Sequence, residues 1–252
     1  MASTHLNFAA QPLIQVSAKF GLRREKDLPV CIPFVNDLHD LLRETFPDLG
    51  DLPQQELPPG AASAISFSMG QQLVGAVYGG GESSCVFILQ RNMIAVRWLK
   101  ELDRAYPKYR AEILPKMKLV SNAIQQLVGP EGFVPHVVAM EYLTFIDAEA
   151  PFDGKRVEEL VGRLVPPIAA DRSTLSNTAV VWRSPNEVEL NVSVTLADPG
   201  TGPNGYVLRT AGGKILADPL KAVDELNVVH DELCAMFAKM VTKQANTEWQ
   251  RQ

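Results

Sequence analysis

The alternating pattern of residues 187–198 constrains the fold more than any other feature of this chain. In the segment EVELNVSVTLAD, apolar Val and Leu alternate with Glu, Asn, Ser and Thr at every second position. Successive side chains of a β-strand point to opposite faces, so this pattern predicts a strand with one buried and one polar face. The segment at 12–23, PLIQVSAKFGLR, alternates in the same way. A sheet with one apolar face needs a second layer to cover that face.

Short apolar segments separated by turn residues follow between 63 and 99. We expect strands at about 63–69, 72–78, 84–90 and 93–99, joined by MGQQ, GGGES and QRNM. Glycine and asparagine tolerate the positive φ angles of tight turns, which favours hairpins at these connections. Residues 47–62 contain four prolines and two glycines, and we predict that they form a loop.

Helical periodicity indicates the layer that covers the sheet. Apolar residues recur at helical spacing in the segments 35–46, 106–128 and 219–244. Asp218 followed by Pro219 is typical of an N-cap and a first helical position. Pro115 interrupts the middle helix, so we expect either a fresh start or a kink there.

The second half of the chain repeats the order of elements of the first half. The predicted elements are a strand at 136–147, a short helix at 155–165, a hairpin around Pro185 and Asn186, and two strands at 206–210 and 214–217 that could pair. Each half, 1–130 and 131–252, then reads β-α-β4-α, and we expect the two to form one compact unit. The predicted fold class is α+β, a mainly antiparallel sheet with long helices packed on one face. This internal duplication rests on element order alone, because no residue-level repeat relates the halves.

The composition narrows the class of protein. The 252 residues have a net charge of −5, three cysteines far apart in the sequence, and no apolar run of the roughly 18 residues needed to span a bilayer. The first residues lack the basic start and apolar stretch of a signal peptide, and the cysteines fit reduced thiols. We therefore expect a cytoplasmic protein without membrane association. The acidic balance makes nucleic-acid binding unlikely.

Five residues near the centre of the chain are candidates for an interaction surface. They combine arginine with aromatic rings, as interaction hot spots do, and they are Arg97, Trp98, Arg104, Tyr106 and Tyr109. Trp98 also continues the parity of the apolar strand residues before it, so it equally suits the core.

His39 and His230 lie in the apolar stripes of their helices and are the remaining candidates. A histidine that faces a cavity can contact a ligand or act as a base, whereas a buried imidazole can also be purely structural. Cys234 lies four residues after His230, but the chain has no Cys-x-x-Cys or His-Glu-x-x-His motif. We expect no metal site.

No catalytic motif is found. The nucleophile pattern Gly-x-Ser-x-Gly is absent, and YGGGES lies between two predicted strands rather than before a helix. The paired carboxylates are adjacent in sequence, so only one of each pair could face a shared site. We expect no catalytic residues and no cofactor, and the sequence leans towards a protein that is not an enzyme.

Four segments together make the chain similar to a known family. They are QPLIQVSAKF, FILQRNMIAVRWLKELDRAYPKY, MEYLTFID and VVHDELCAMFAKMVTKQANTEW, in that order. With them the chain resembles a sporadically distributed family of uncharacterised bacterial proteins. The resemblance implies no active site, and the patchy occurrence of the family implies a defence or toxin–antitoxin context. The order of elements also resembles the TATA-box-binding-protein-like class, which includes helix-grip ligand-binding proteins, although fold does not determine function.

Three functions follow as hypotheses. We expect a non-enzymatic binding protein that presents a surface to an unknown protein partner, which includes an antitoxin-like protein or a homodimer. The alternative is a small apolar or anionic ligand in a cavity beneath the C-terminal helix, lined by His39 and His230. Nucleic-acid binding by the sheet is a third and weaker hypothesis, and steep salt dependence would reveal it.

Overall fold

The computed structural model describes residues 13–23, 27–51, 75–80, 84–100, 106, 108–147, 178–196 and 205–240. The strands are β1 (Leu13–Leu22), β2 (Asp48–Asp51), β3 (Gly75–Gly79), β4 (Cys85–Gln90), β5 (Met93–Leu99), β6 (Pro135–Asp147), β7 (Thr178–Arg183), β8 (Glu189–Leu196) and β9 (Gly205–Ile215). The helices are α1 (Ile32–Leu42), α2 (Ile113–Val128), the short 3₁₀ helix η4 (Pro219–Lys221) and α4 (Ala222–Met240). The strand expected at 63–69 and the helix expected at 155–165 lie outside the described residues.

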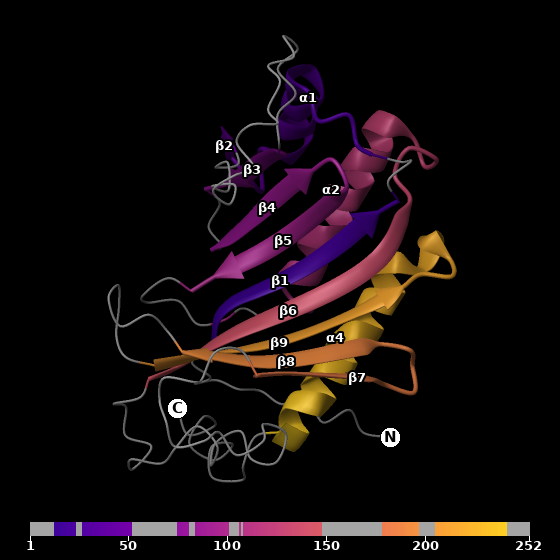
Figure 1. The fold of residues 1–252 in the computed structure, drawn as a ribbon. Helices are drawn as coiled ribbons and strands as arrows, with labels where there is room; N and C mark the ends of the chain where they lie inside the picture. The colour runs from indigo at the N-terminus through magenta and orange to yellow at the C-terminus, as the bar shows by residue number, and fades with distance from the viewer. Residues whose placement is uncertain are drawn as a thin grey trace, which may run out of the picture.

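All nine described strands form one sheet, in the order β2-β3-β4-β5-β1-β6-β9-β8-β7 (Figure 1). Every neighbouring pair is antiparallel. The predicted α+β class with an antiparallel sheet is therefore confirmed. The first strand of each half lies at the centre, where β1 pairs with β6, and each also pairs with the last strand of its own half. The two halves thus share one sheet, with an order that is nearly symmetric about the β1–β6 pair.

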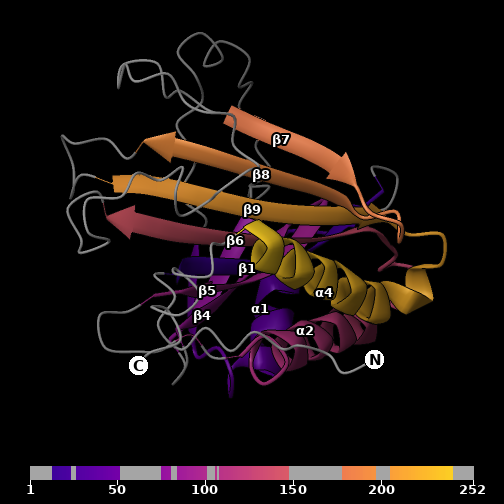
Figure 2. The same cartoon turned by 90° about the horizontal axis from the view of Figure 1, so that it is seen from below.

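The long helices cover one face of this sheet, as expected. Figure 2 shows α2 and α4 side by side beneath the strands. Helix α4 packs on β6 and β9, and α2 packs on β5 and β1, while α1 packs against α2. Sheets with helices on one side bury alternate residues of each strand, which explains the period of two in the sequence. The opposite face of the sheet, which we call the open face, carries the other half of each alternation.

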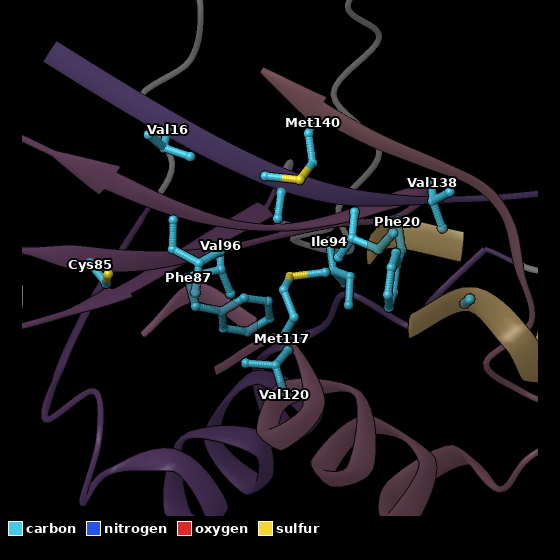
Figure 3. Close-up of a cluster of buried hydrophobic side chains, with 14 of the residues drawn as sticks. Val16, Phe20, Cys85, Phe87, Ile94, Val96, Met117, Val120, Val138 and Met140 are labelled. Carbon is cyan, nitrogen blue, oxygen red and sulfur yellow. The ribbon is translucent and has the colours of Figure 1, made fainter. Parts of the chain in front are cut away.

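The core lies between the sheet and the helices α1, α2 and α4. Figure 3 shows side chains of β1, β4, β5 and β6 directed towards Met117 and Val120 of the helix. Opposite partners across β1 and β5 include Ala18 with Val96 and Phe20 with Ile94. All of these side chains are essentially fully buried. Burial of each large apolar side chain contributes about 1.5–3 kcal/mol, so this layer sets the register of the central strands.

One short strand was not expected. Residues 47–62 were predicted as a loop, but Asp48–Asp51 form β2, which pairs with β3 at the edge of the sheet. Only four residues pair, and apolar and polar residues do not alternate among them, so the sequence contains no periodic signal that predicts this strand. Charged residues on a short edge strand discourage pairing with another chain.

The predicted hairpin between 206–210 and 214–217 is wrong. Residues 205–215 form one continuous strand, β9, which pairs along its length with β6 and with β8. Gly212 is needed for packing rather than for a turn, because a Cβ there would lie 3.1 Å from Leu233 Cγ of α4 and 3.2 Å from Leu190 Cδ2. The glycine lets α4 approach the sheet closely.

The helix predicted from residue 106 begins later. Residues 109–112 form turns, and α2 starts at Ile113, so Pro115 falls in its first turn. A proline there sacrifices no hydrogen bond, since the first N–H groups of a helix have no partner within it. Of the two alternatives, the fresh start is confirmed.

The hairpin expected around Pro185 and Asn186 is confirmed and joins β7 to β8. The hydroxyl of Ser184 accepts hydrogen bonds from the backbone N–H groups of Asn186 and Val188. Glu187 takes a φ of 62°, which completes the turn.

Candidate functional site

Four of the seven candidate residues come together beneath α4. The rings of Trp98 and Tyr106 meet edge to face, with centroids 5.1 Å apart. Tyr109 stacks on His230, with centroids 4.2 Å apart and an angle of 16° between the planes. Tyr142 and Cys234 interact with Tyr106 in the same region. We call these six residues, Trp98, Tyr106, Tyr109, Tyr142, His230 and Cys234, the tyrosine cluster.

Three separate parts of the fold supply the tyrosine cluster. Trp98 of β5 and Tyr142 of β6 are both partners of Val16 on β1, so they lie in one row on the helix-covered face. Tyr106 and Tyr109 precede α2, and His230 and Cys234 lie one turn apart on α4. The tyrosine cluster therefore combines residues of the sheet, of the segment before α2 and of α4.

Three tyrosine hydroxyls of the cluster are buried without a hydrogen-bond partner among the described residues. They belong to Tyr106, Tyr109 and Tyr142. The hydroxyls of Tyr106 and Tyr142 interact, but not with the geometry of a good hydrogen bond. Burial raises the pKa of all three phenols above the usual value, so each keeps its proton at neutral pH. Buried polar groups normally have partners, which makes this group unusual.

The other polar members of the cluster have partners. His230 Nδ1 lies 2.9 Å from Asp231 Oδ1, and His230 Nε2 lies 3.6 Å from Cys234 Sγ. A neutral imidazole that donates a hydrogen bond from Nδ1 to the carboxylate can accept a hydrogen bond from the thiol at Nε2. Asp231 is also paired with Arg110, at 3.2 Å from Nη2 to Oδ2, with both side chains half exposed.

The order thiol, imidazole, carboxylate has the form of a nucleophilic triad, but the thiol is not activated. Burial, and then the negative charge of Asp231, raise the pKa of Cys234 to about 12. A nucleophilic cysteine requires a lowered pKa, because the thiolate is the reactive form. The arrangement is chemically a protonated, buried thiol.

A second arrangement of polar residues lies on the open face. Arg97 Nε donates to Ser17 Oγ at 3.2 Å, from β5 to β1. Glu141 of β6 accepts from Lys19 Nζ at 3.5 Å and from Arg209 Nη2 at 2.8 Å. We call Lys19, Arg97, Glu141 and Arg209 the charged network. Two cations therefore contact one carboxylate at the middle of the sheet, and Arg97 lies on the other side of Ser17 from that carboxylate.

The charge state of Glu141 follows from its neighbours. Burial would raise the pKa of this carboxyl, but the charge of Lys19 and the hydrogen bonds and charge of Arg209 outweigh burial and lower it. Glu141 is therefore ionised at neutral pH and holds two of the cations in place. Arg97 is the network cation that has no carboxylate partner in the described part of the chain.

The remaining candidates lie elsewhere. His39 of α1 lies 2.9 Å from the Pro47 carbonyl oxygen through Nε2, and its ring is 6.1 Å from Tyr78 of β3. Helix α1 packs on α2 and lies beside β3, whereas α4 packs on β6 and β9 (Figure 1). The structure therefore does not bring His39 and His230 together. Arg104 lies outside the described residues.

The expected interaction surface is divided by the sheet. Arg97 points to the open face, but Trp98 and Tyr109 are 1% and 2% exposed on the other side. A strand sends neighbouring residues to opposite faces, so Arg97 and Trp98 cannot share a surface. Sequence reasoning did not single out Tyr142, Lys19, Glu141 or Arg209. Pairing of MEYLTFID with β1 in register places Glu141 on the polar face and Tyr142 on the apolar face, and this was the signal in the sequence that could have identified them.

Neither further features of the structure nor a comparison with known proteins assigns this chain to a family. Among the described residues, no group of three or more His, Cys, Asp or Glu could hold a metal ion together, and no helix is long and apolar enough to cross a membrane. No family model matches the sequence, and no curated protein matches it. A solved structure described as "KH domains" aligns with 100% of this chain and 92% of that chain, at 7% identity and a TM-score of 0.28.

Proposed function

We propose that this is a non-enzymatic binding protein and that the open face of its sheet receives a protein partner. The observation that carries the proposal is the charged network at the centre of that face. Helices cover the opposite face and leave this one without a second layer of described elements (Figures 1 and 2).

Arg97 is the residue we expect to contact the partner. Its Nε is held by Ser17, which leaves the terminal nitrogens of the guanidinium directed away from that bond. An arginine fixed in this way loses little freedom when it binds a carboxylate through two parallel hydrogen bonds. Leu99, two residues along the same face of β5, is 42% exposed and offers apolar contact beside the charge. The partner should therefore present a carboxylate next to an apolar side chain.

The rest of the network supports Arg97 and gives the face its sign. Glu141 neutralises part of the charge of Lys19 and Arg209, so a positive excess remains in a chain with a net charge of −5. Local charge of one sign steers a partner of the opposite sign and sets specificity more than affinity. The nearly symmetric sheet order supports the proposal that the fold belongs to the TATA-box-binding-protein-like class. That the protein acts in a defence or antitoxin context is a separate proposal, which rests on the resemblance of the sequence to the bacterial family.

The test is capture of a partner by the full-length chain and by two charge variants. Arg97→Glu reverses the charge on the open face, and Lys118→Glu makes the same change at an exposed position of α2 on the helix side. We expect a partner purified with the wild type from its host cells to be lost with Arg97→Glu and retained with Lys118→Glu. Retention by Arg97→Glu would contradict the proposal. Salt-sensitive retention of the wild type on a nucleic-acid column, lost in the same variant, would favour nucleic acid instead.

A further inference from the structure

The two strands that flank β1 carry opposite charges at the same level of the open face. Ser17 of β1 pairs with Arg97 of β5 on one side and with Glu141 of β6 on the other. Neighbouring strands lie about 4.8 Å apart, so the two charged residues are at equal distances from Ser17. A half-turn about the line of β1 would place Arg97 of one copy of the chain over Glu141 of a second copy, and Glu141 over Arg97. A two-fold symmetric interface has this property, since each residue i meets j and each j meets i.

The other levels of the open face match in the same way. Strands β5 and β6 are both antiparallel to β1, so a half-turn about β1 keeps every level in register (Figure 1). At each of these levels it would bring apolar side chains together. The matched residues are Leu99 with Leu143, Ala95 with Ala139 and Met93 with Val137 next to β1, and Val86 with Ala211 and Ile88 with Gly213 one strand further out. The open face is therefore complementary to itself.

Glu141 has an oxygen available for the arginine of a second copy. Its Oε2 accepts the bonds from Lys19 and Arg209, whereas Oε1 receives no hydrogen bond from the described part of the chain. Stacked sheets lie about 10 Å apart, a gap that an arginine and a glutamate side chain bridge together. The carboxylate beside an apolar side chain that Arg97 requires is thus present in this chain, as Glu141 beside Leu143.

Lys19 lies on the line of β1 and would face Lys19 of the second copy. Its Nζ is 3.5 Å from Glu141 Oε2, so the ammonium leans towards β6. After a half-turn about β1, the ammonium of the second copy leans in the opposite direction. The two cations would therefore stand apart, each beside its own carboxylate.

The area of the face allows a dimer of modest strength. The seven strands from β3 to β8 are centred on β1. With about 4.8 Å between strands and about 3.3 Å per residue, seven strands over seven residues give at most about 800 Å² for each copy. A specific interface buries about 800 Å² of each partner. The charged network contributes three cations and one carboxylate from each copy, so an excess of positive charge opposes association, and the dimer should depend on concentration.

We propose that the protein partner of the open face is a second copy of this chain, and that the two sheets pack face to face about a two-fold axis along β1. The proposal rests on the proposed function, since it names the occupant of the same surface. Arg97 of each copy binds Glu141 of the other, and Leu99 of each copy packs on Leu143 of the other.

Sedimentation velocity of the purified full-length chain, between about 2 and 200 µM, tests for the dimer. We expect the mass to rise from 27.7 kDa towards twice that value, with half of the chains dimeric between about 5 and 100 µM. The mass of a single chain at about 200 µM would overturn the proposal. A monomeric chain that still captures a different protein, and loses it with Arg97→Glu, would keep the partner surface and exclude only the second copy.

Two charge reversals examine the predicted contact itself. Arg97→Glu and Glu141→Arg each place like charges opposite one another at both symmetric contacts, so each variant alone should dimerise at least about 100-fold more weakly than the wild type. In an equimolar mixture, both contacts again join opposite charges. We expect a dimer with one chain of each variant, within about tenfold of the wild-type affinity. Absence of this mixed dimer, or wild-type dimerisation of either variant alone, would contradict the proposed interface.

A third variant keeps the test decisive if Glu141→Arg does not fold. Leu99 is 42% exposed, so Leu99→Asp should fold normally, but the carboxylate would face Leu143 of the second copy. The dimer should weaken at least about tenfold, because a charge is buried against an apolar side chain. Lys118→Glu, at an exposed position of α2 on the helix side, is the matched control and should dimerise like the wild type. Unchanged dimerisation of Leu99→Asp, or an equal loss with Lys118→Glu, would rule out this interface.

Discussion

The ring of Tyr109 lies parallel to the imidazole of His230, with the two centroids 4.2 Å apart. This contact joins the segment before α2 to the middle of α4, so it connects the helix of one half to the helix of the other. The ion pair between Arg110 and Asp231, the next residue of each segment, lies beside it on the surface. The two contacts differ in burial, and burial decides which of them holds the helices together.

Replacement of these neighbours should have unequal effects. Tyr109→Ala should lower the free energy of unfolding by about 3–5 kcal/mol, because it removes a ring that is 2% exposed. Arg110→Ala should cost less than about 1 kcal/mol, because exposed ion pairs contribute little. Urea unfolding at neutral pH measures both. A larger loss from Arg110→Ala than from Tyr109→Ala would refute this ranking.

The adjacent glycines of β9 offer a matched pair. A Cβ at Gly212 would lie 3.1 Å from Leu233 Cγ, whereas at Gly213 the nearest atom would be 3.5 Å away. We expect Gly212→Ala to lower the free energy of unfolding by about 1–2 kcal/mol through overpacking. Gly213→Ala should be neutral or stabilise by about 0.5 kcal/mol, since it only restricts the unfolded chain. Thermal unfolding compares them, and equal midpoints would mean that α4 does not press on Gly212.

Two buried tyrosines should respond differently to the loss of a hydroxyl. Tyr78→Phe removes a hydrogen bond to the Val35 carbonyl and should cost about 1 kcal/mol. Tyr142→Phe removes a hydroxyl without a partner among the described residues, so it should be neutral or stabilising. Urea unfolding of the wild type and the two variants is the measurement. A clear loss of stability in Tyr142→Phe would show that its hydroxyl is already satisfied.

Glu141 should make the stability depend on acid pH. The cations lower its pKa in the folded state, so its stabilisation is present above the unfolded-state value near 4.5 and is lost as the pH falls through the folded-state value. At pH 7 the free energy of unfolding of the wild type should exceed that of Glu141→Gln by about 1 kcal/mol, a small value because Arg209 is partly exposed. This difference should shrink as the pH falls below about 4.5.

Unfolding of both proteins between about pH 7 and pH 3 tests this expectation. The double variant Lys19→Met/Arg209→Met is the control. Without the two cations only burial acts on the carboxyl and raises its pKa, so the advantage of Glu141 over Glu141→Gln at pH 7 should be lost or reversed in this background. A difference that persists unchanged at low pH would mean that the carboxylate is not the stabilising group.

The three cysteines should react at different rates. A thiol with a pKa of about 12 is almost entirely protonated at pH 8, so native Cys234 should react with iodoacetamide at least about 100-fold more slowly than an ordinary thiol. Cys85 is 1% exposed and should be protected by burial, while Cys31 is partly exposed and should react first. Peptide mass spectrometry follows the order, and labelling in urea should remove it. Rapid native labelling of Cys234 would instead indicate an activated nucleophile.

The alternation of polar and apolar residues determined the class of fold. Strands β1 and β8 coincide with segments that alternate, because a period of two is a local property of a strand in a one-sided sheet. Strands β4 and β5 coincide with short apolar segments that turn residues separate. The helices α2 and α4 were predicted from apolar residues at helical spacing, which is also a local property of the sequence. Local patterns fail where a neighbour decides the conformation, as at Asp48–Asp51, where pairing with β3 creates the strand.

The sites depended on contacts between distant segments. The sequence singled out Trp98, Tyr106, Tyr109 and His230 separately, but only the packing of α4 on β6 brings them to Tyr142. The charged network likewise needs Glu141 beside two strands that are far away in the chain. A residue's own period shows which face it takes, whereas its neighbours on that face follow from strand order and register. Those are set by the burial of the whole core, and no short stretch of sequence contains that information.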